Sequence, residues 1–382
     1  MTRGLATAID LLSPHQRRRP LGIHDEIPFG RIPTNHMFIC DYLKSYGGWQ
    51  RPQIVAVHKF EMAPSSLVFH YGQEIFEGLK AYFNPETPDK FHLFRHDRNA
   101  ARMFHSARRL GMVEVPQSLF MTAVEELVQV ESEWLLPEPG SLYIRPALIP
   151  LDEGVSYRAG ENYRFFVILS PAKNYYGKED SIAINIEREF VRAAPGGSGE
   201  AKCGGNYASA LPGLKKARAK GADQCLWLDA IHRTYVEEVG TMNIMFSYGA
   251  KILTPELNGS ILPGVTRESL IELARHLGYQ VEETKIDIQE IISDAKSKKL
   301  DEVFGCGTAA VVTPVGELID GDERIAVGNG TPGPIATRLK NELVGIQNGK
   351  LKDVFGWRKT FDINPAMQGF SKFNPAVEYD FW

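Results

Sequence analysis

The stretch "GGSGEAKCGGNYAS", from Gly196 to Ser209, places a single lysine, Lys202, among five glycines. Glycine loses more conformational entropy on folding than any other residue, so this density indicates a tight turn or a close approach to the backbone. Most lysines are nevertheless solvated, and most glycine-rich stretches are loops. A phosphate-binding P-loop requires serine or threonine directly after its lysine, whereas Cys203 follows Lys202. The stretch alone therefore leaves the role of Lys202 open.

Bulk composition excludes several classes of protein. A chain of 382 residues is too long for one ordinary core, so two domains are expected. The net charge of -4 argues against a nucleic-acid surface. The four cysteines are scattered without a C-x-x-C motif, which indicates a reducing compartment and no metal site. No apolar run approaches the ~18 residues of a membrane span, and the N-terminus lacks a signal-peptide core. We therefore expect a cytoplasmic protein with neither a membrane nor a nucleic acid as partner.

The hydrophobic periodicity divides the chain into two α+β halves. We expect a smaller N-terminal domain over residues 1–170, a linker over 171–181, a larger C-terminal domain over 182–358 and an unassigned extension over 359–382. The expected strands span residues 53–60, 67–72, 90–95, 140–151, 163–172, 182–192, 223–230, 234–240, 241–249 and 251–257, with a strand, glycine turn and strand over 301–315. The expected helices span residues 97–111, 118–135, 210–221 and 265–278.

Two of the expected helices carry terminal signals. Thr266 is a candidate N-cap and Gly278 a candidate C-cap of the helix over 265–278. Pro212 is compatible with the helix over 210–221 only if it lies in the first turn, because a proline further inside removes a backbone hydrogen bond.

Two stretches near the C-terminal end of the chain have the character of anion sites. In "ILPGVTRESL" a turn leads into a helix N-terminus, where backbone N–H groups and the helix dipole favour negative charge. "GCGTA", residues 305–309, offers a second turn with free N–H groups and the Thr308 hydroxyl. Gly305, Gly307 and Ala310 also satisfy the dinucleotide fingerprint, but a β-branched run with Pro314 follows where that fingerprint requires a helix. The dinucleotide interpretation is therefore disfavoured.

A lysine that is flanked by glycines, taken together with the two anion sites, indicates a phosphate-bearing cofactor that is attached to lysine. Pyridoxal 5'-phosphate fits, because its aldehyde condenses with a lysine amine. This cofactor also needs a carboxylate at its ring nitrogen, and "EEVGTMN" supplies Glu237 and Glu238 on an expected strand. Successive strand residues face opposite sides, so only one of the two points inward.

Seven stretches, in order, resemble the branched-chain-amino-acid aminotransferases of the fold-type IV pyridoxal-phosphate class. They are "HYGQEIFEGLKAY", "FRHDRNAARM", "SLYIRP", "AKCGGNY", "EEVGTMN", "ILPGVTRESL" and "GCGTAAVVTPV". The resemblance runs from about Ile27 to Trp357. It implies a two-domain α+β fold of the D-amino-acid-aminotransferase-like type, with the cofactor in the interdomain cleft. It also implies ping-pong transamination of L-leucine, L-isoleucine and L-valine with 2-oxoglutarate, which gives branched-chain 2-oxo acids and L-glutamate in amino-acid biosynthesis.

The resemblance also implies roles for the cofactor-binding residues. Lys202 would be the catalytic residue, attached covalently to the cofactor and later carrying the proton. Glu238 would pair with the ring nitrogen, and Tyr207 would bond the phenolate oxygen. The residues implied to hold the phosphate are Arg102, Val265, Thr266 and Thr308.

The same resemblance implies a substrate pocket. The turn of Gly307, Thr308 and Ala309, together with the Tyr143 hydroxyl, would take the α-carboxylate. Arg145, two residues beyond Tyr143 on the same strand face, would orient the tyrosine and meet the distal carboxylate of glutamate. The remaining substrate-binding residues implied are Tyr71, Phe76, Tyr175 and Thr241; for the aromatic residues, plain core packing is an equal alternative.

Some features depart from the family or stay open. Ala310 and Thr313 stand where the mammalian members carry a C-x-x-C pair, so redox regulation by that pair is excluded, while Cys203 and Cys306 could still react. The family forms homodimers or larger assemblies in which one N-terminal domain helps to close the partner's site, and we expect at least a homodimer. Alternative hypotheses are a D-amino-acid aminotransferase or aminodeoxychorismate lyase of the same fold, or a dinucleotide-dependent oxidoreductase or non-catalytic binding protein.

Overall fold

The computed structural model describes residues 6–173 and 181–365. The chain divides into two compact units, one formed by Met1–Tyr175 with Ile346–Trp382 and the other by Tyr176–Gly345. The predicted boundaries differ at the C-terminal end, because residues 346–358 return to the first unit. The predicted linker over 171–181 lies mostly outside the described residues.

The first unit contains one mixed sheet, and its path runs β1-β4-β2-β9-β8-β6-β7-β19, with β3 pairing β2 and β5 pairing β8. The strands are β1 (Ala8–Ile9), β2 (His36–Leu43), β3 (Gly48–Trp49), β4 (Gln53–Ala56), β5 (Ile75–Phe76), β6 (Leu79–Phe83), β7 (Lys90–Phe94), β8 (Ser141–Pro150), β9 (Tyr163–Ala172) and β19 (Arg358–Asp362). The helices are α1 (Leu67–Tyr71), α2 (His96–Arg109) and α3 (Gln117–Val130), with short 3-10 turns at Pro14–Gln16, Lys44–Tyr46 and Ser132–Trp134.

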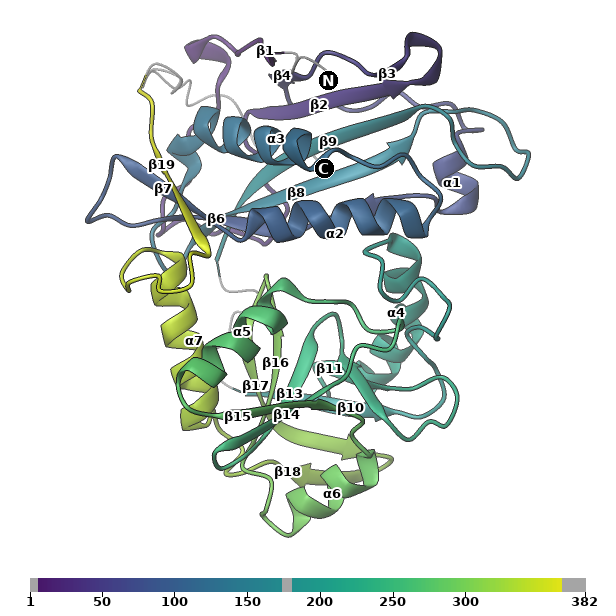
Figure 1. Cartoon of the computed structure of the whole chain (residues 1–382), viewed down its shortest axis with the longest axis vertical. Helices are drawn as coiled ribbons and strands as arrows, with labels where there is room; N and C mark the ends of the chain where they lie inside the picture. Colours follow the sequence, from purple (N-terminus) through teal and green to yellow (C-terminus); the bar gives the residue numbers. More distant parts are fainter. Residues whose placement is uncertain (1–5, 174–180, 366–382) are drawn as a thin grey trace. The chain divides into compact units, whose positions relative to one another are not determined.

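Helices α2 and α3 lie along one face of this sheet (Figure 1). Strand β9 alternates buried and half-buried residues over its first half, as expected for a strand with one covered face. Phe165, one of its buried residues, stacks on Phe120 of α3 with ring centroids 6.1 Å apart. The helices therefore pack on the sheet face that includes the long strand pair of β8 and β9.

The second unit contains a nine-stranded sheet with the path β12-β11-β10-β17-β16-β13-β14-β15, and β18 pairs β17. Its strands are β10 (Ile182–Glu187), β11 (Gln224–Leu228), β12 (Val236–Val239), β13 (Asn243–Tyr248), β14 (Lys251–Pro255), β15 (Gln280–Thr284), β16 (Glu302–Gly307), β17 (Val311–Asp320) and β18 (Glu323–Ala326). Its helices are α4 (Gly204–Ala219), α5 (Val265–His276), α6 (Ile288–Lys296) and α7 (Pro334–Gln347), the last of which ends beyond the unit boundary.

Strand β11 is buried on both faces, which explains its continuous apolar run. Leu226 and Leu228 join the main core of the unit, whereas Cys225 and Trp227 face the cluster under α4. Helix α4 comes closest at Gly213, where a Cβ atom would lie 2.5 Å from the Trp227 ring. A glycine is therefore required at this contact.

Several expected elements need correction. Residues 67–71 form the short helix α1 and not a strand, and Gly72 ends this helix with a φ of 59°. Helix α4 begins at Gly204, so Pro212 lies in its interior. The carbonyl that loses its partner belongs to Ala208, and both Ala208 and Pro212 are exposed, so water can bond that carbonyl.

Two further differences concern the ends of α5 and the C-terminal extension. The N-cap of α5 is Gly264 and not Thr266, which lies inside the first turn, while Gly278 does take a positive φ of 91° after the helix. Part of the unassigned extension forms β19, which pairs antiparallel with β7. Arg358 to Asp362 thus complete an edge of the first sheet.

Candidate active site

Lys202 directly precedes helix α4, and the start of that helix sets its surroundings. Cys203 is extended and serves as the N-cap, so Tyr207 falls in the first turns of α4. The Lys202 amine donates a hydrogen bond of 2.7 Å to the Tyr207 hydroxyl and lies 5.3 Å from the centre of its ring. The two groups that were predicted to meet the cofactor are therefore adjacent.

The glycines around Lys202 differ in how tightly their surroundings constrain them. Gly196 adopts a left-handed φ of 78°. A Cβ atom on Gly199 would lie 2.2 Å from the carbonyl oxygen of Ser260. Gly205 lies in the first turn of α4 with open space around it. Only some of these glycines are therefore dictated by close approach of the backbone.

Glu238 on β12 is buried and lies in a network of charges. Its Oε2 pairs with Arg192 Nε at 2.8 Å, and its Oε1 accepts the backbone N–H of Leu262 at 2.7 Å. Burial raises the pKa of Glu238, although the Arg192 charge, the Leu262 hydrogen bond and the Lys202 charge each oppose the rise. Arg192 therefore holds the carboxylate in a fixed orientation.

Glu237 points away from Glu238, as the alternation of strand residues requires. Its Oε1 accepts hydrogen bonds from the Ser260 hydroxyl and from Asn258 Nδ2. The two acidic residues therefore have separate partners on the two sides of β12.

The N-terminus of α5 is positioned by a contact between backbone and side chain. Asn243 on β13 donates to the carbonyl of Leu262 at 3.0 Å, and a Cβ atom on Gly264 would lie 2.0 Å from Asn243 Oδ1. Val265 and Thr266 follow directly and are buried. This arrangement fixes the first turn of the helix, where an anion is favoured.

The predicted second anion turn is the connection between β16 and β17. Gly307 pairs with Val311, so Thr308, Ala309 and Ala310 form the loop of a three-residue hairpin. Val311 takes a positive φ of 61°, which is strained for a β-branched residue. Thr241 lies in the turn between β12 and β13 and is exposed.

In the first unit, Arg102 on α2 is held by Glu77. The guanidinium Nε and Nη2 contact the two oxygens of that carboxylate at 2.7 and 2.8 Å. Asn99 also donates to Glu77, at 2.8 Å. All three side chains are buried, so the orientation of Arg102 is strongly constrained.

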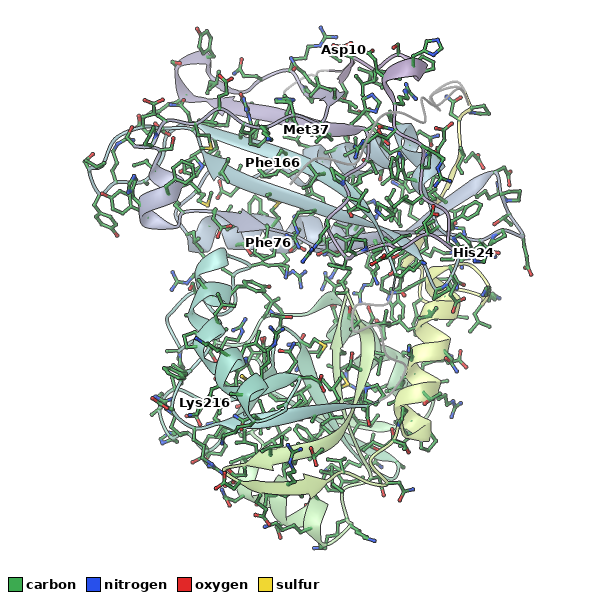
Figure 2. The ribbon with its side chains drawn as sticks, turned by 180° about the vertical axis from the view of Figure 1, so that it is seen from behind. Asp10, His24, Met37, Phe76, Phe166 and Lys216 are labelled. Atoms are coloured by element: carbon green, nitrogen blue, oxygen red, sulfur yellow. The ribbon has the colours of Figure 1, made fainter. Side chains whose placement is uncertain are left out.

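Tyr143 and Arg145 lie on one face of β8, as predicted. Arg145 Nη2 donates to the Tyr143 hydroxyl at 3.1 Å, and the guanidinium lies 4.7 Å from the centre of the Phe76 ring on β5. Phe76 is labelled on the first unit in Figure 2. Arg145 Nε is buried and has no hydrogen-bond partner within residues 6–173 and 181–365. A Cβ atom on Gly78 would lie 2.2 Å from the Tyr143 hydroxyl oxygen, so any larger residue here would displace the Tyr143 side chain.

Tyr71, another predicted pocket residue, has contacts of its own. The Tyr71 hydroxyl on α1 donates to the carbonyl of Val155, and its ring packs edge-on against Tyr157 at 5.5 Å. Local packing therefore accounts for the position of Tyr71 as well as a role in the substrate pocket would. Tyr175 lies outside the described residues.

Comparisons with known proteins identify the family. The family described as amino-transferase class IV matches residues 74–318. Branched-chain-amino-acid aminotransferase 2 of Bacillus subtilis (strain 168) is 44% identical over 343 residues, which cover 89% of this chain and 93% of that protein. The crystal structure of the Escherichia coli branched-chain amino acid aminotransferase has a TM-score of 0.69 at 30% identity, covering 81% of this chain and 97% of that chain.

The chain belongs to the branched-chain-amino-acid aminotransferases. This membership confirms the predicted fold-type IV class, the transaminase activity and pyridoxal 5'-phosphate as cofactor. The T.th. branched-chain amino acid aminotransferase, in a crystal structure complexed with N-(5'-phosphopyridoxyl)-L-glutamate, has a TM-score of 0.66 at 27% identity and covers 85% of this chain and 98% of that chain. The dinucleotide interpretation is excluded.

The residues of this aminotransferase fit the cofactor chemically. Lys202 supplies a primary amine beside a phenol. Glu238 retains lone pairs for a pyridinium N–H, because the described residues use two of its roughly four acceptor positions. The first turn of α5 suits a phosphate. A partly buried arginine with an unpartnered Nε suits a substrate carboxylate.

Sequence reasoning missed three charged residues that the structure connects to predicted ones. Arg192 anchors Glu238, and Glu77 anchors Arg102. Lys80 lies directly opposite Tyr143 in the pairing of β6 with β8, and burial lowers the pKa of this lysine to about 8. Glu77 and Lys80 both stand in the stretch "FEGLKAY", where charged residues in an otherwise apolar strand were the available signal.

Proposed function

We propose that this aminotransferase transfers the amino group of L-leucine, L-isoleucine or L-valine to 2-oxoglutarate by a ping-pong mechanism. The products are the branched-chain 2-oxo acids and L-glutamate. Identity of 44% to a branched-chain-amino-acid aminotransferase over 89% of the chain is the observation that carries the proposal. The glutamate conjugate in the T.th. relative supports glutamate as the second substrate.

The proposed cofactor contacts use the residues of the second unit and Arg102. Lys202 holds the cofactor and moves the substrate proton at its amine, and Tyr207, already bonded to that amine, orients it. Glu238 keeps a proton on the ring nitrogen, and Arg192 fixes the carboxylate that does so. Val265, Thr266, Thr308 and Arg102 bind the phosphate. Pyridoxal 5'-phosphate supplies the electron sink that makes removal of the substrate proton feasible.

The proposed substrate contacts explain how one pocket takes both an aliphatic and an acidic side chain. The turn of Gly307, Thr308 and Ala309 and the Tyr143 hydroxyl bind the α-carboxylate. A carboxylate placed in apolar surroundings loses its hydration, so a cation must meet the distal group of glutamate. Arg145, stacked on Phe76 beside Tyr143, is that cation, because guanidinium binds carboxylate bidentately and keeps its charge. Thr241, Tyr71 and Tyr175 are proposed to border the pocket.

Borohydride reduction of the holoenzyme, followed by peptide mapping, tests the attachment. We expect the pyridoxyl label on Lys202 alone, and L-leucine should abolish the visible absorbance band of the unreduced enzyme. Lys202→Ala should remove the label and the activity. Lys215→Ala, a matched change at an exposed lysine of α4, should change neither. A label on another lysine, or a response to D-alanine but not to L-leucine, would contradict the proposal.

We also propose a cytoplasmic homodimer in which the N-terminal domain completes the partner's site. Among the residues that the structure describes, no helix is both long and apolar enough to span a bilayer. Sedimentation of the holoenzyme should give a mass twice that of one chain. Full activity of a monomer at high dilution would disprove the shared site.

A further inference from the structure

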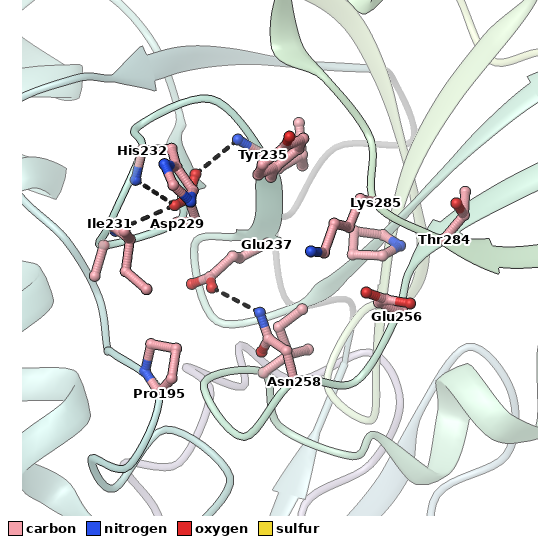
Figure 3. Close-up of a pocket in the computed structure, with 14 residues that line it drawn as sticks. Pro195, Asp229, Ile231, His232, Tyr235, Glu237, Glu256, Asn258, Thr284 and Lys285 are labelled. Atoms are coloured by element: carbon pink, nitrogen blue, oxygen red, sulfur yellow. Dashed lines mark hydrogen bonds between the residues drawn. The ribbon is translucent and has the colours of Figure 1, made fainter.

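A cavity of about 170 Å³ lies within the second unit, on the Glu237 side of β12 (Figure 3). Its walls come from the loop before β12, the segment after β14 and the end of β15. Ile231, Pro255 and Ile261 provide apolar surface, and Glu237 and Lys285 provide opposite charges. Of the described residues, none that is assigned above to the cofactor or the substrate lines it.

Glu237 is the buried anion of this cavity. The residue is only 3% exposed, and both hydrogen bonds to its carboxylate, from Ser260 and Asn258, go to Oε1. Oε2 is buried and has no hydrogen-bond partner among the residues that the structure describes. Leaving a buried carboxylate oxygen unsatisfied is costly, so this atom is a ready acceptor for a ligand that carries a cationic donor.

Lys285 supplies the cation of the same cavity. Its ammonium lies 5.6 Å from the centre of the Tyr235 ring, and no ion pair within the described ranges joins it to Glu237. Asp229 is another acidic residue of the lining. Its carboxylate already accepts hydrogen bonds from backbone N–H groups of the loop that it closes (Figure 3). Glu237 and Lys285 therefore face a common space without neutralising each other.

The volume limits the occupant. An apolar cavity of about 150 Å³ holds one benzene molecule, so this cavity accommodates a molecule of similar size. An anion and a cation that has no ion pair within the described part of the chain match, across such a space, the ammonium and the carboxylate of an amino acid. The apolar walls match a small side chain.

We propose that this cavity is a second, non-catalytic binding site for a small zwitterionic α-amino acid. The ammonium group binds Glu237 Oε2 and the carboxylate binds Lys285. This inference rests on the cavity and its charges and does not depend on which amino acids are transaminated.

The site is connected to the catalytic carboxylate by a short chain of contacts. The Ser260 hydroxyl bonds Glu237, the Ser260 carbonyl accepts Arg192 Nη1 at 2.8 Å, and Arg192 Nε pairs with Glu238. The charge of Glu237 also contributes to the raised pKa of Glu238. A bound ammonium offsets that charge, so occupancy lowers the pKa of Glu238 and favours its ionised form.

Calorimetric titration of the borohydride-reduced holoenzyme with each of the twenty amino acids tests the proposal, because reduction blocks reaction at Lys202. We expect saturable binding of at least one small amino acid. Lys285→Gln and Glu237→Gln should each weaken it roughly ten- to a hundredfold, the loss of one charge-assisted contact. Lys299→Gln and Glu282→Gln, matched changes at exposed positions outside the cavity, should leave it unchanged.

Two ligand analogues sharpen the test. The amine that lacks the carboxylate should bind the reduced enzyme as weakly as the amino acid binds the Lys285→Gln variant. The acid that lacks the ammonium should bind it as weakly as the amino acid binds the Glu237→Gln variant. Absence of binding by all twenty amino acids, equal binding by the amine, or binding unaffected in the Lys285→Gln variant would each overturn the proposal. Lys285 is exposed, so this variant remains informative if the buried Glu237→Gln variant does not fold.

Discussion

Replacing Arg145 by methionine tests how one pocket distinguishes glutamate from leucine. Among the described residues, Arg145 has one hydrogen-bond partner, Tyr143, and its buried Nε has none. A glutamate carboxylate would therefore gain contacts that leucine never uses. A charge-assisted contact contributes about 1.5–3 kcal/mol, or roughly 10- to 150-fold in kcat/KM. The Tyr143 bond, lost for both substrates, contributes only about 0.5–1.5 kcal/mol. Arg145→Met should therefore weaken glutamate and 2-oxoglutarate roughly 10- to 150-fold more than leucine.

Single-turnover half-reactions of the cofactor-bound enzyme with glutamate and with leucine measure the loss of rate for each substrate separately. Arg164→Met is the matched control, because Arg164 also stacks on a phenylalanine, 5.0 Å from the Phe60 ring, but pairs with Asp41 away from the β8 cluster. Lys80→Met tests whether Lys80, a second buried cation beside Tyr143, binds glutamate instead. An equal loss for both substrates in Arg145→Met, with a selective loss for glutamate in Lys80→Met, would refute the role given to Arg145.

Three further predictions concern stability and reactivity. Gly199→Ala should destabilise the protein by roughly 1–3 kcal/mol in denaturant unfolding, because the new methyl would overlap a backbone carbonyl, whereas Gly205→Ala, with open space, should stabilise α4 by about 0.5–1 kcal/mol. Burial raises the pKa of Cys306 to about 12, so iodoacetamide at pH 8 should label this thiol only after unfolding; rapid labelling of the native protein would contradict this. Burial lowers the pKa of His92 to about 4, so the folded state favours the neutral ring, and its stabilising contribution is complete above about pH 6.5 and lost as the pH falls toward 4. His92→Gln should flatten the dependence of the free energy of unfolding on pH in that window.

The sequence predicted the elements whose signals are local. The helices α2, α3 and α5 and the strands β8 and β9 follow from periodicity, and they are confirmed within a few residues at most ends. The alternation rule required Glu237 and Glu238 to face opposite sides, and the structure gives them separate partners. The roles of the individual site residues remain predictions.

The elements that the sequence did not predict depend on contacts between distant residues. Strand β19 exists because it pairs with β7, more than 250 residues earlier, and its own five residues show little periodicity. The start of α4 was placed six residues too late, because glycine has a low helix propensity and concealed the first turn. The pairs of Arg102 with Glu77 and of Arg192 with Glu238 join different elements, so no local pattern reveals them.

The glycines around Lys202 have a further consequence for the catalytic carboxylate. Close packing at Gly199 brings the backbone against Ser260, and Arg192 donates to the carbonyls of both residues, at 3.2 Å from Nη2 to Gly199 and 2.8 Å from Nη1 to Ser260. The remaining nitrogen, Nε, is then directed to Glu238. A side chain at position 199 would push these carbonyls apart and release the guanidinium that orients Glu238. The glycine-rich stretch therefore presents the lysine and, through Arg192, also positions the carboxylate proposed to hold the ring-nitrogen proton.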